Sequence, residues 1–220
     1  MLKQAISYFI PFTKKIKTKF NGILEVRWIN GRKVLDTQNA NYSYGSAQRI
    51  LKYSLEKIDL STVSDILLLG LGGGSVIRSL RESFGYKGKI TAVDLDPEII
   101  RIAQDEFGIS EDTTLSIECD DALDYITRTK SKFDLIIIDL FIDNKVPDKF
   151  LSVIFWGKIA SKINENGYMI FNSIGSIDHN IEPVKETLSQ KGFELHEYDN
   201  LEGSNRLLIG KLSAEIENAL

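Results

Sequence analysis

Apolar positions along the chain form two alternating patterns, short unbroken runs and longer stretches with helical spacing. The unbroken runs, such as Ile66–Leu69 and Leu135–Ile138, are typical of parallel strands buried on both faces. Strands are predicted at 66–69, 90–93, 114–118, 133–139, 168–173, 193–198 and 206–210. Helices are predicted at about 45–58, 75–84, 97–107, 121–129, 150–159 and 180–190. The alternation and the short connections predict an α/β doubly wound sheet of seven strands, mostly parallel, with an antiparallel last strand.

The two ends of the chain show other patterns. Asn30-Gly31 lies between two β-rich runs, which predicts a β-hairpin over 20–37. Apolar residues at 2, 6, 9 and 10 share one helical face and predict a short helix that ends at Pro11, and a terminal helix is predicted at 212–219. We expect residues 1–40 to form an appendage to a main domain over 41–220. The main domain or a second subunit must cover the appendage, and we expect a homodimer.

Composition and charge exclude several classes of protein. The chain is 43% hydrophobic and 26% charged, with a net charge of −4, which does not indicate a nucleic-acid partner. Residues 1–20 carry five lysines and no acid, a pattern more typical of a solvated edge than of a polyanion site. One cysteine and two histidines exclude internal disulfides and indicate no metal site. Because no segment has the length of a membrane span or the order of a signal peptide, we expect a cytoplasmic protein without a membrane partner.

A glycine-rich turn follows the first buried strand of the main domain. Gly70, Gly72 and Gly74 have G-x-G-x-G spacing, a helix follows, and Asp94 ends the next strand twenty residues beyond Gly74. Glycines let a ligand approach the backbone, and an acid at this distance is placed to accept hydrogen bonds from a ribose. A dinucleotide site would need a glycine at Ser75. The pattern therefore favours a nucleoside of the S-adenosylmethionine type, and the alternative is a tight turn that needs small residues.

Acidic residues end three of the predicted strands, Asp94, Asp120 and Asp139. In open α/β sheets, ligands bind beyond the carboxyl ends of the strands. The alternative is that these side chains only cap the following helices, which applies most to Asp120 or Asp121. Asp139 is followed by an apolar segment with no immediate helix, so we expect a functional carboxylate there.

Four segments, LLLGLGGGSV, AVDLDPEII, ECDDALDYI and FDLIIIDLFIDNKVP, resemble successive motifs of the spermidine synthase family. This family has the class I S-adenosylmethionine-dependent methyltransferase fold, and the resemblance covers roughly residues 20–175. It implies that the glycines pass under the methionine part of the nucleoside, that Asp94 holds the ribose and that Asp120 holds the adenine amino group beside Ala122. It also implies that Asp139 takes a proton from the attacking amine. The implied cofactor-binding residues are Gly70, Leu71, Gly72, Gly73, Gly74, Asp94, Leu95, Asp120, Asp121, Ala122 and Asp139.

The chain departs from the family where a polyamine would bind. Gly73 stands where the family has an acid for the aminopropyl amine, and Ile142 replaces a second acid, with Asp143 one residue late. Residues 38–46 lack the family's carboxylates but keep Tyr42 and Tyr44. Burying a dication without paired anions costs several kcal/mol.

We therefore expect a transferase that moves the methyl group of S-adenosylmethionine to a small-molecule acceptor, with an amine as one option. Asp139 would act as the catalytic base and Tyr44, or Tyr42, as an orienting or lid residue. One alternative is an aminopropyltransferase that uses decarboxylated S-adenosylmethionine and a polyamine, with Asp143 as an added anion. The other alternative is a non-catalytic nucleoside-binding module.

Overall fold

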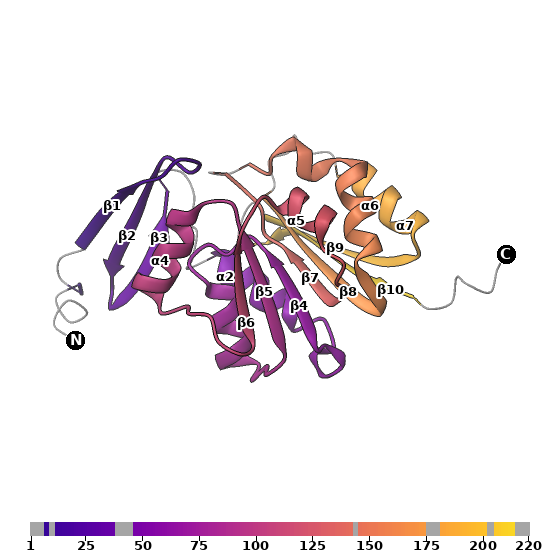
Figure 1. Ribbon diagram of the computed structural model, residues 1–220, viewed down its shortest axis with the longest axis horizontal. Coiled ribbons are helices and arrows are strands. Elements are labelled where there is room, and N and C mark those ends of the chain that lie inside the picture. The colour runs from indigo at the N-terminus through magenta and orange to yellow at the C-terminus, as the bar shows by residue number, and fades with distance from the viewer. Residues whose placement is uncertain are drawn as a thin grey trace.

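The computed structural model describes residues 7–8, 12–37, 46–142, 145–174, 181–201 and 205–213 of the 220-residue chain. In these ranges, no helix combines the length and the apolar character that a membrane crossing requires. The described residues form two β-sheets, a large one flanked by helices and a small one at the N-terminal end (Figure 1).

The large sheet has seven strands in the order β6-β5-β4-β7-β8-β10-β9. Its strands are β4 (Asp65–Leu69), β5 (Lys89–Asp94), β6 (Leu115–Cys119), β7 (Phe133–Ile138), β8 (Ile163–Ile174), β9 (Phe193–Leu201) and β10 (Asn205–Leu212). Strand β10 runs antiparallel to both of its neighbours, whereas β4 to β8 pair in parallel. The predicted fold class, a mostly parallel seven-stranded α/β sheet, is confirmed.

Each face of this sheet is covered by its own hydrophobic core. In β4, Ile66 and Leu68 belong to one core and Leu67 and Leu69 to the other, as alternation along a strand requires. The first core includes residues of α2 (Ser46–Leu55), α3 (Ser75–Arg78) and α4 (Pro97–Phe107), and the second those of α5 (Ala122–Arg128), α6 (Val153–Ser161) and α7 (Glu182–Gln190). Short helical turns lie at η1 (Leu60–Thr62), η2 (Ser79–Ser83) and η3 (Asp148–Leu151).

Two elements of the large domain differ from their prediction. The helix predicted over 75–84 is α-helical only through α3 and continues as the π-helical turn η2, where the Phe84 N–H donates to the Ser79 carbonyl at 3.2 Å. The strand predicted at 168–173 begins earlier, at Ile163 of β8. Its pairing with β7 shifts register between Ile163 and Tyr168, where Asn166 has a φ of 60°.

The N-terminal sheet consists of β1 (Phe12–Lys17), β2 (Ile23–Ile29) and β3 (Arg32–Asp36), all antiparallel. The predicted hairpin is therefore right for β2 and β3 but incomplete, because the lysine-rich segment forms a third strand. In β1, Lys15 and Lys17 flank Ile16, which is buried and pairs with Leu24. Of the predicted N-terminal helix, only Ser7 and Tyr8 are described, and they form a turn beside Asn30, whose N–H donates to the Ser7 carbonyl at 3.2 Å.

Some predictions fall partly outside the described residues. The predicted boundary at residue 40 lies in the segment 38–45, and residues 214–219 of the predicted terminal helix lie beyond the last described residue. Leu212 belongs to β10. Association into a dimer stays a prediction.

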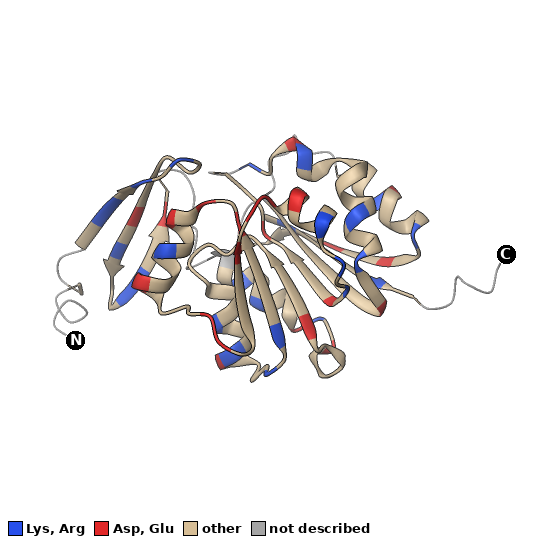
Figure 2. Cartoon of the chain, viewed as in Figure 1, with Lys and Arg blue, Asp and Glu red and all other residues tan. Residues whose placement is uncertain are grey.

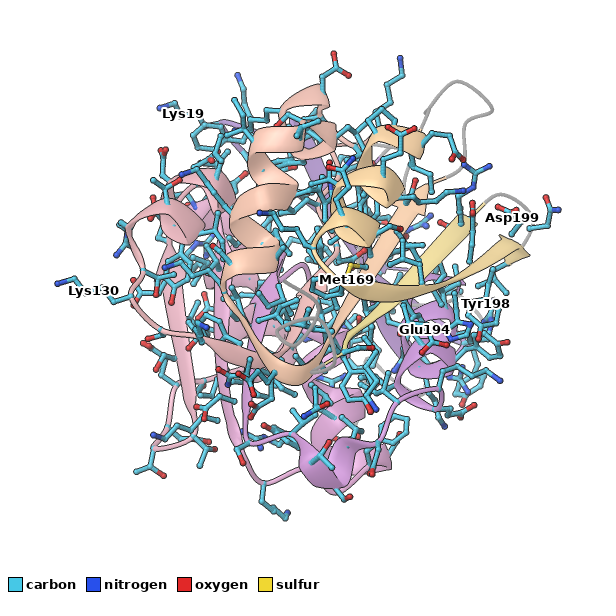
Figure 3. All side chains as sticks on the ribbon, turned by 90° about the vertical axis from the view of Figure 1, so that its right-hand side faces the viewer. Lys19, Lys130, Met169, Glu194, Tyr198 and Asp199 are labelled. Atoms are coloured by element: carbon cyan, nitrogen blue, oxygen red, sulfur yellow. The ribbon has the colours of Figure 1, made fainter. Side chains whose placement is uncertain are left out.

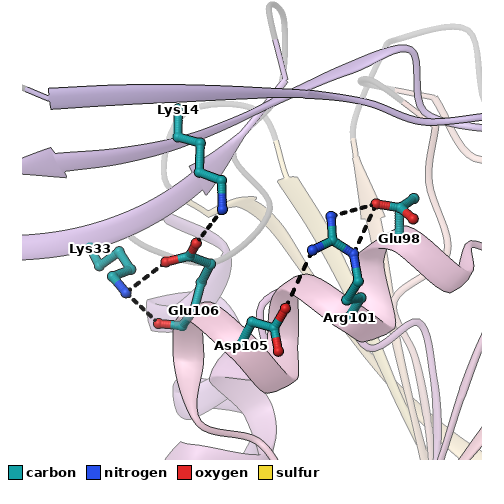
Figure 4. Close-up of polar contacts among 6 residues, drawn as sticks. All are labelled: Lys14, Lys33, Glu98, Arg101, Asp105 and Glu106. Carbon is teal, nitrogen blue, oxygen red and sulfur yellow. Dashed lines mark hydrogen bonds and ion pairs between the residues drawn. The ribbon is translucent and has the colours of Figure 1, made fainter.

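Ion pairs connect helix α4 to the N-terminal sheet. Lys14 of β1 and Lys33 of β3 both reach Glu106 near the end of α4, with Nζ–Oε distances of 2.7 and 3.0 Å (Figure 4). Lys33 Nζ also donates to the Glu106 carbonyl at 2.7 Å, and the two lysines hold the pKa of the Glu106 carboxyl below its usual value. At the far edge of the large sheet, Glu194 and Asp199 of β9 are exposed, whereas Met169 of β8 lies in the interior (Figure 3).

Candidate active site

A cleft opens at the carboxyl ends of the parallel strands. It encloses about 800 Å³ including its solvent-open mouth. Acidic residues gather in the loops that leave the strands on the side of the N-terminal sheet (Figure 2). Predicted residues that line the cleft are Gly70, Gly72, Asp94, Leu95, Asp120, Asp121, Ala122 and Asp139. Lining residues that the sequence analysis did not assign to the site are Phe20, Asn21, Val93, Ile99, Leu140, Phe141, Ile142, Pro147, Lys149 and Phe150.

Backbone hydrogen bonds place the predicted strand-end residues side by side. The N–H of Gly70 donates to Val93 of β5 at 2.9 Å, and the N–H of Asp139 donates to Leu69 of β4, also at 2.9 Å. The N–H of Asp120 donates to the Asp94 carbonyl at 3.1 Å. The cleft floor therefore runs from the end of β6 through β5 and β4 to the end of β7.

The glycine turn between β4 and α3 depends on the absence of side chains at two positions. Gly70 has a φ of +97°, and a Cβ there would lie 2.2 Å from the Asp139 carbonyl oxygen. Gly74 has a φ of +74°, and its Cβ would lie 2.3 Å from Ile109 Cγ1. Gly73 and Gly74 are buried and do not line the cleft, and the Leu71 side chain belongs to the core. Steric crowding therefore explains why residues 70 and 74 are glycines, and Gly70 and Gly72 both line the cleft.

Asp94 joins the glycine turn to the end of β5. Its Oδ2 accepts from the N–H groups of Leu71 at 3.0 Å and Gly72 at 3.4 Å, and its Oδ1 accepts from the N–H of Asp96 at 3.0 Å. Burial raises the pKa of Asp94 to about 6, although these hydrogen bonds oppose the rise. Helix α4 is capped by Asp96, which accepts from the Glu98 N–H at 3.0 Å, so Asp94 has no capping role.

Asp120 and Asp121 have different roles at the end of β6. Asp120 Oδ2 accepts from Arg128 Nε at 2.8 Å. Asp121 caps α5, because its Oδ1 accepts from the Leu123 N–H at 2.9 Å, and its Oδ2 forms an ion pair with Lys149. The capping alternative therefore holds for Asp121 and not for Asp120, and both carboxylates are paired with a cation.

Asp139 is the half-buried carboxylate at the end of β7. Burial raises its pKa to about 6, although Asn172 Nδ2 donates to its Oδ1 at 2.9 Å. The side chain of Asn172 is buried, and its Oδ1 has no hydrogen-bond partner among the described residues. Among the residues that the structure describes, no lysine or arginine forms an ion pair with Asp139. A carboxyl with a pKa near neutrality is suited to accept a proton.

Several predicted site residues cannot be placed. Tyr42, Tyr44 and Asp143 lie outside the described residues. Among the residues that are described, no cluster of three or more histidine, cysteine, aspartate or glutamate side chains could hold a metal ion.

Two of the segments that sequence reasoning missed bring polar side chains to the cleft. Phe20 and Asn21 form the β1–β2 turn, for which the Asn21-Gly22 pair was an available signal of the same kind as Asn30-Gly31. Lys149 and Phe150 lie on η3 and enter the cleft through tertiary folding, which no local pattern in the sequence indicates.

Comparison with known proteins identifies the family. The Spermine/spermidine synthase domain family matches residues 48–196. The eEF1A lysine and N-terminal methyltransferase of Mus musculus is 31% identical over 127 residues, which cover 52% of this chain and 18% of that protein. Polyamine aminopropyltransferase 2 of Aquifex aeolicus is 33% identical over 113 residues, which cover 47% of this chain and 22% of that protein. The chain thus matches less than a quarter of the length of either relative.

Solved structures with the same fold come from both kinds of enzyme. Human methyltransferase-like protein 13 in complex with SAH has a TM-score of 0.63 at 24% identity, covering 79% of this chain and 85% of that one. A probable spermidine synthase from Corynebacterium glutamicum has a TM-score of 0.61 at 20% identity, covering 92% and 77%. These likenesses show the S-adenosylmethionine-dependent methyltransferase fold. Because the family match covers more than half of the chain, the protein belongs to the Spermine/spermidine synthase domain family, whose relatives matched here are methyltransferases and aminopropyltransferases.

Proposed function

We propose that the chain binds S-adenosylmethionine in the cleft and transfers its methyl group to an amine. The observation that carries this proposal is the position of Asp139. It ends β7 beside the glycine turn, it is half-buried with a pKa raised to about 6 by burial, and no described cation pairs with it. It is therefore available to take the proton of an incoming nucleophile.

The nucleoside would occupy the strand ends from β6 to β4. Asp94 keeps acceptor capacity for ribose hydroxyls, because two oxygens offer about four lone-pair sites and three backbone N–H groups use part of them. Val93, Leu95, Ile99 and Ala122 provide apolar surface for a base beside the polar end of Asp120. The methionine part would then run over Gly70 and Gly72 toward Asp139.

The reaction is a displacement at the carbon bound to the sulfonium. The amine nitrogen forms a bond to the methyl carbon, the carbon–sulfur bond breaks, and its electron pair stays on sulfur. The nitrogen releases a proton to Asp139, which Asn172 Nδ2 orients through the 2.9 Å hydrogen bond. S-adenosylmethionine supplies the activated methyl group, and the chain supplies position and the proton acceptor.

Charge in the cleft favours methyl transfer over aminopropyl transfer to a diamine. A diamine carries two positive charges, and each needs an anion when it is buried. Within the described residues, Asp120 is paired with Arg128 and Asp121 with Lys149, which leaves Asp139 as a lining carboxylate without a cation and Asp94 engaged with backbone N–H groups.

The acceptor class is supported by the names of the relatives. One group of relatives is named for transfer to lysine and to a protein N-terminus, and the other for transfer to polyamines. Each of these acceptors presents an amine nitrogen, as a small molecule or as part of a protein. The Aquifex relative also favours a second candidate function, aminopropyl transfer from decarboxylated S-adenosylmethionine.

The test uses purified protein and two labelled donors. Methyl-labelled S-adenosylmethionine is offered with putrescine and with lysine-containing and free N-terminal peptides, and decarboxylated S-adenosylmethionine is offered with putrescine. We expect labelled product from the methyl donor only, with loss of turnover but retained S-adenosylhomocysteine binding in Asp139→Asn. Spermidine formation would support the second candidate. Nucleoside binding without turnover of any acceptor would support a non-catalytic module.

A further inference from the structure

The β1–β2 turn reaches the cleft from a different sheet. Phe20 and Asn21 line the cleft, although the other described lining residues belong to the large domain. Asn21 Nδ2 donates to Asp96 Oδ2 at 2.8 Å. Asp96 is 1% exposed and accepts the Glu98 N–H with its other oxygen, so both of its oxygens have a defined partner. This contact holds the turn over the end of β5.

The contact belongs to a chain of hydrogen bonds that ends at the glycine turn. Asn21 donates to Asp96, whose own N–H donates to Asp94 Oδ1 at 3.0 Å. Asp94 Oδ2 in turn accepts from the Leu71 N–H at 3.0 Å. The carboxylates of Asp96 and Asp94 thus connect the β1–β2 turn, the end of β5 and the glycine turn. These three segments would surround a nucleoside.

The docking of the sheet does not depend on Asn21 alone. Lys14 and Lys33 hold the sheet to Glu106 at the opposite end of α4 from Asp96 (Figure 4). The Asn21 contact therefore determines where the turn lies, while the lysines hold the sheet as a whole.

We propose that Asn21 is a positioning residue that holds Phe20 as a wall of the nucleoside half of the cleft, an inference that rests on the proposed function. Phe20 is partly exposed, and its ring extends the apolar lining provided by Val93, Leu95 and Ile99. A nucleoside bound beside Asp94 would bury more of this ring, and apolar burial strengthens binding. The N-terminal sheet then contributes directly to nucleoside affinity.

The test measures S-adenosylhomocysteine affinity by calorimetry in the full chain. Asn21→Asp replaces the donor with a carboxylate facing Asp96, and we expect binding to weaken about tenfold. Adding Asp96→Asn restores a donor–acceptor pair with reversed direction and keeps the α4 cap, since Asn and Asp cap about equally well. We expect this double variant to return to within about threefold of the wild type. Phe20→Ala should also weaken binding about tenfold.

Lys14→Ala is the matched control, because it removes one docking ion pair of the same sheet and leaves the turn and Lys33 in place. Its affinity should equal that of the wild type. Equal affinities in the wild type, Asn21→Asp and Phe20→Ala would overturn the inference, and so would a double variant that folds but binds as weakly as Asn21→Asp. A wild type that binds the nucleoside but transfers no methyl group would contradict the proposed function and leave this inference standing. A wild type that does not bind the nucleoside would contradict both.

Discussion

Replacing Asp139 by asparagine should stabilise the protein at neutral pH while it abolishes transfer. Burial raises the pKa of Asp139 from 3.8 to about 6, so the folded state disfavours the ionised form. A shift of about two units corresponds to about 3 kcal/mol at pH 7. Discounting for the partial exposure of the carboxyl leaves about 1–2 kcal/mol. The amide keeps the shape of the side chain and an oxygen that can accept the hydrogen bond from Asn172.

The stabilisation expected for Asp139→Asn depends on pH. Below pH 3.8 the carboxyl of Asp139 is protonated in both the folded and the unfolded state, and ionisation imposes no penalty. Between 3.8 and about 6 the penalty grows, and above about 6 it stays constant. The extra stability of Asp139→Asn should therefore be full at pH 7 and about half as large near pH 5. Urea unfolding of the two proteins at both pH values measures the difference.

Asp134 at the other end of β7 provides a control of opposite sign. Burial tends to raise its pKa, but hydrogen bonds from Asn164, Ser64 and Asp65 outweigh burial and lower the pKa below 3.8. Asp134→Asn should therefore destabilise the protein at pH 7, by about 1–2 kcal/mol. The reasoning about Asp139 fails if Asp139→Asn destabilises the fold, or if it stabilises the fold equally at pH 5 and pH 7.

Three further predictions concern the site. At saturating S-adenosylmethionine, kcat should fall about tenfold per pH unit below about 6, because only ionised Asp139 accepts a proton. If the residual kcat of Asp139→Asn falls with pH in the same way, another group causes the fall. Asp94→Ala should weaken S-adenosylhomocysteine binding at least about tenfold in calorimetry, and unchanged affinity would exclude a ribose contact. Because Gly73 is buried and does not line the cleft, Gly73→Asp should not shift the preference toward decarboxylated S-adenosylmethionine; competition binding with the two nucleosides that shows such a shift would place residue 73 beside the ligand's tail.

Much of the large domain could be predicted because its strands are covered on both faces. Such strands are continuous apolar runs, and the pairing of Leu69 with Val93 and with Ile138 then brings the residues that follow them to one edge. This is why Gly70, Asp94 and Asp139 meet at one cleft, as the sequence indicated. Asp121 shows the limit of this reasoning, because a strand-end acid that caps a helix has the same sequence pattern as one that contacts a ligand.

The remaining parts of the site depend on contacts between segments far apart in the chain. Strand β1 was missed because its sequence, FTKKIK, does not alternate between apolar and polar residues. Ile16 is its one buried residue, and a single buried residue does not define a strand face. Phe20 and Asn21 reach the cleft because the N-terminal sheet docks on the large domain, through the ion pairs of Lys14 and Lys33 and through apolar residues such as Leu24 and Val26. The Asn21-Gly22 pair indicates a turn, but no local pattern in the sequence indicates where the sheet docks.

The packing of Trp156 has a practical consequence. Its indole Nε1 donates to the carbonyl of Phe150 at 2.9 Å, and its ring lies edge-on to Phe155 and Phe171 in the core. Phe150 lines the cleft, so a ligand that shifts this residue changes the hydrogen bond that the indole makes. Indole emission is sensitive to such a change, and the chain has only one other tryptophan, Trp28 in the N-terminal sheet. In a Trp28→Phe background, the native fluorescence of Trp156 would follow occupancy of the cleft without any attached dye.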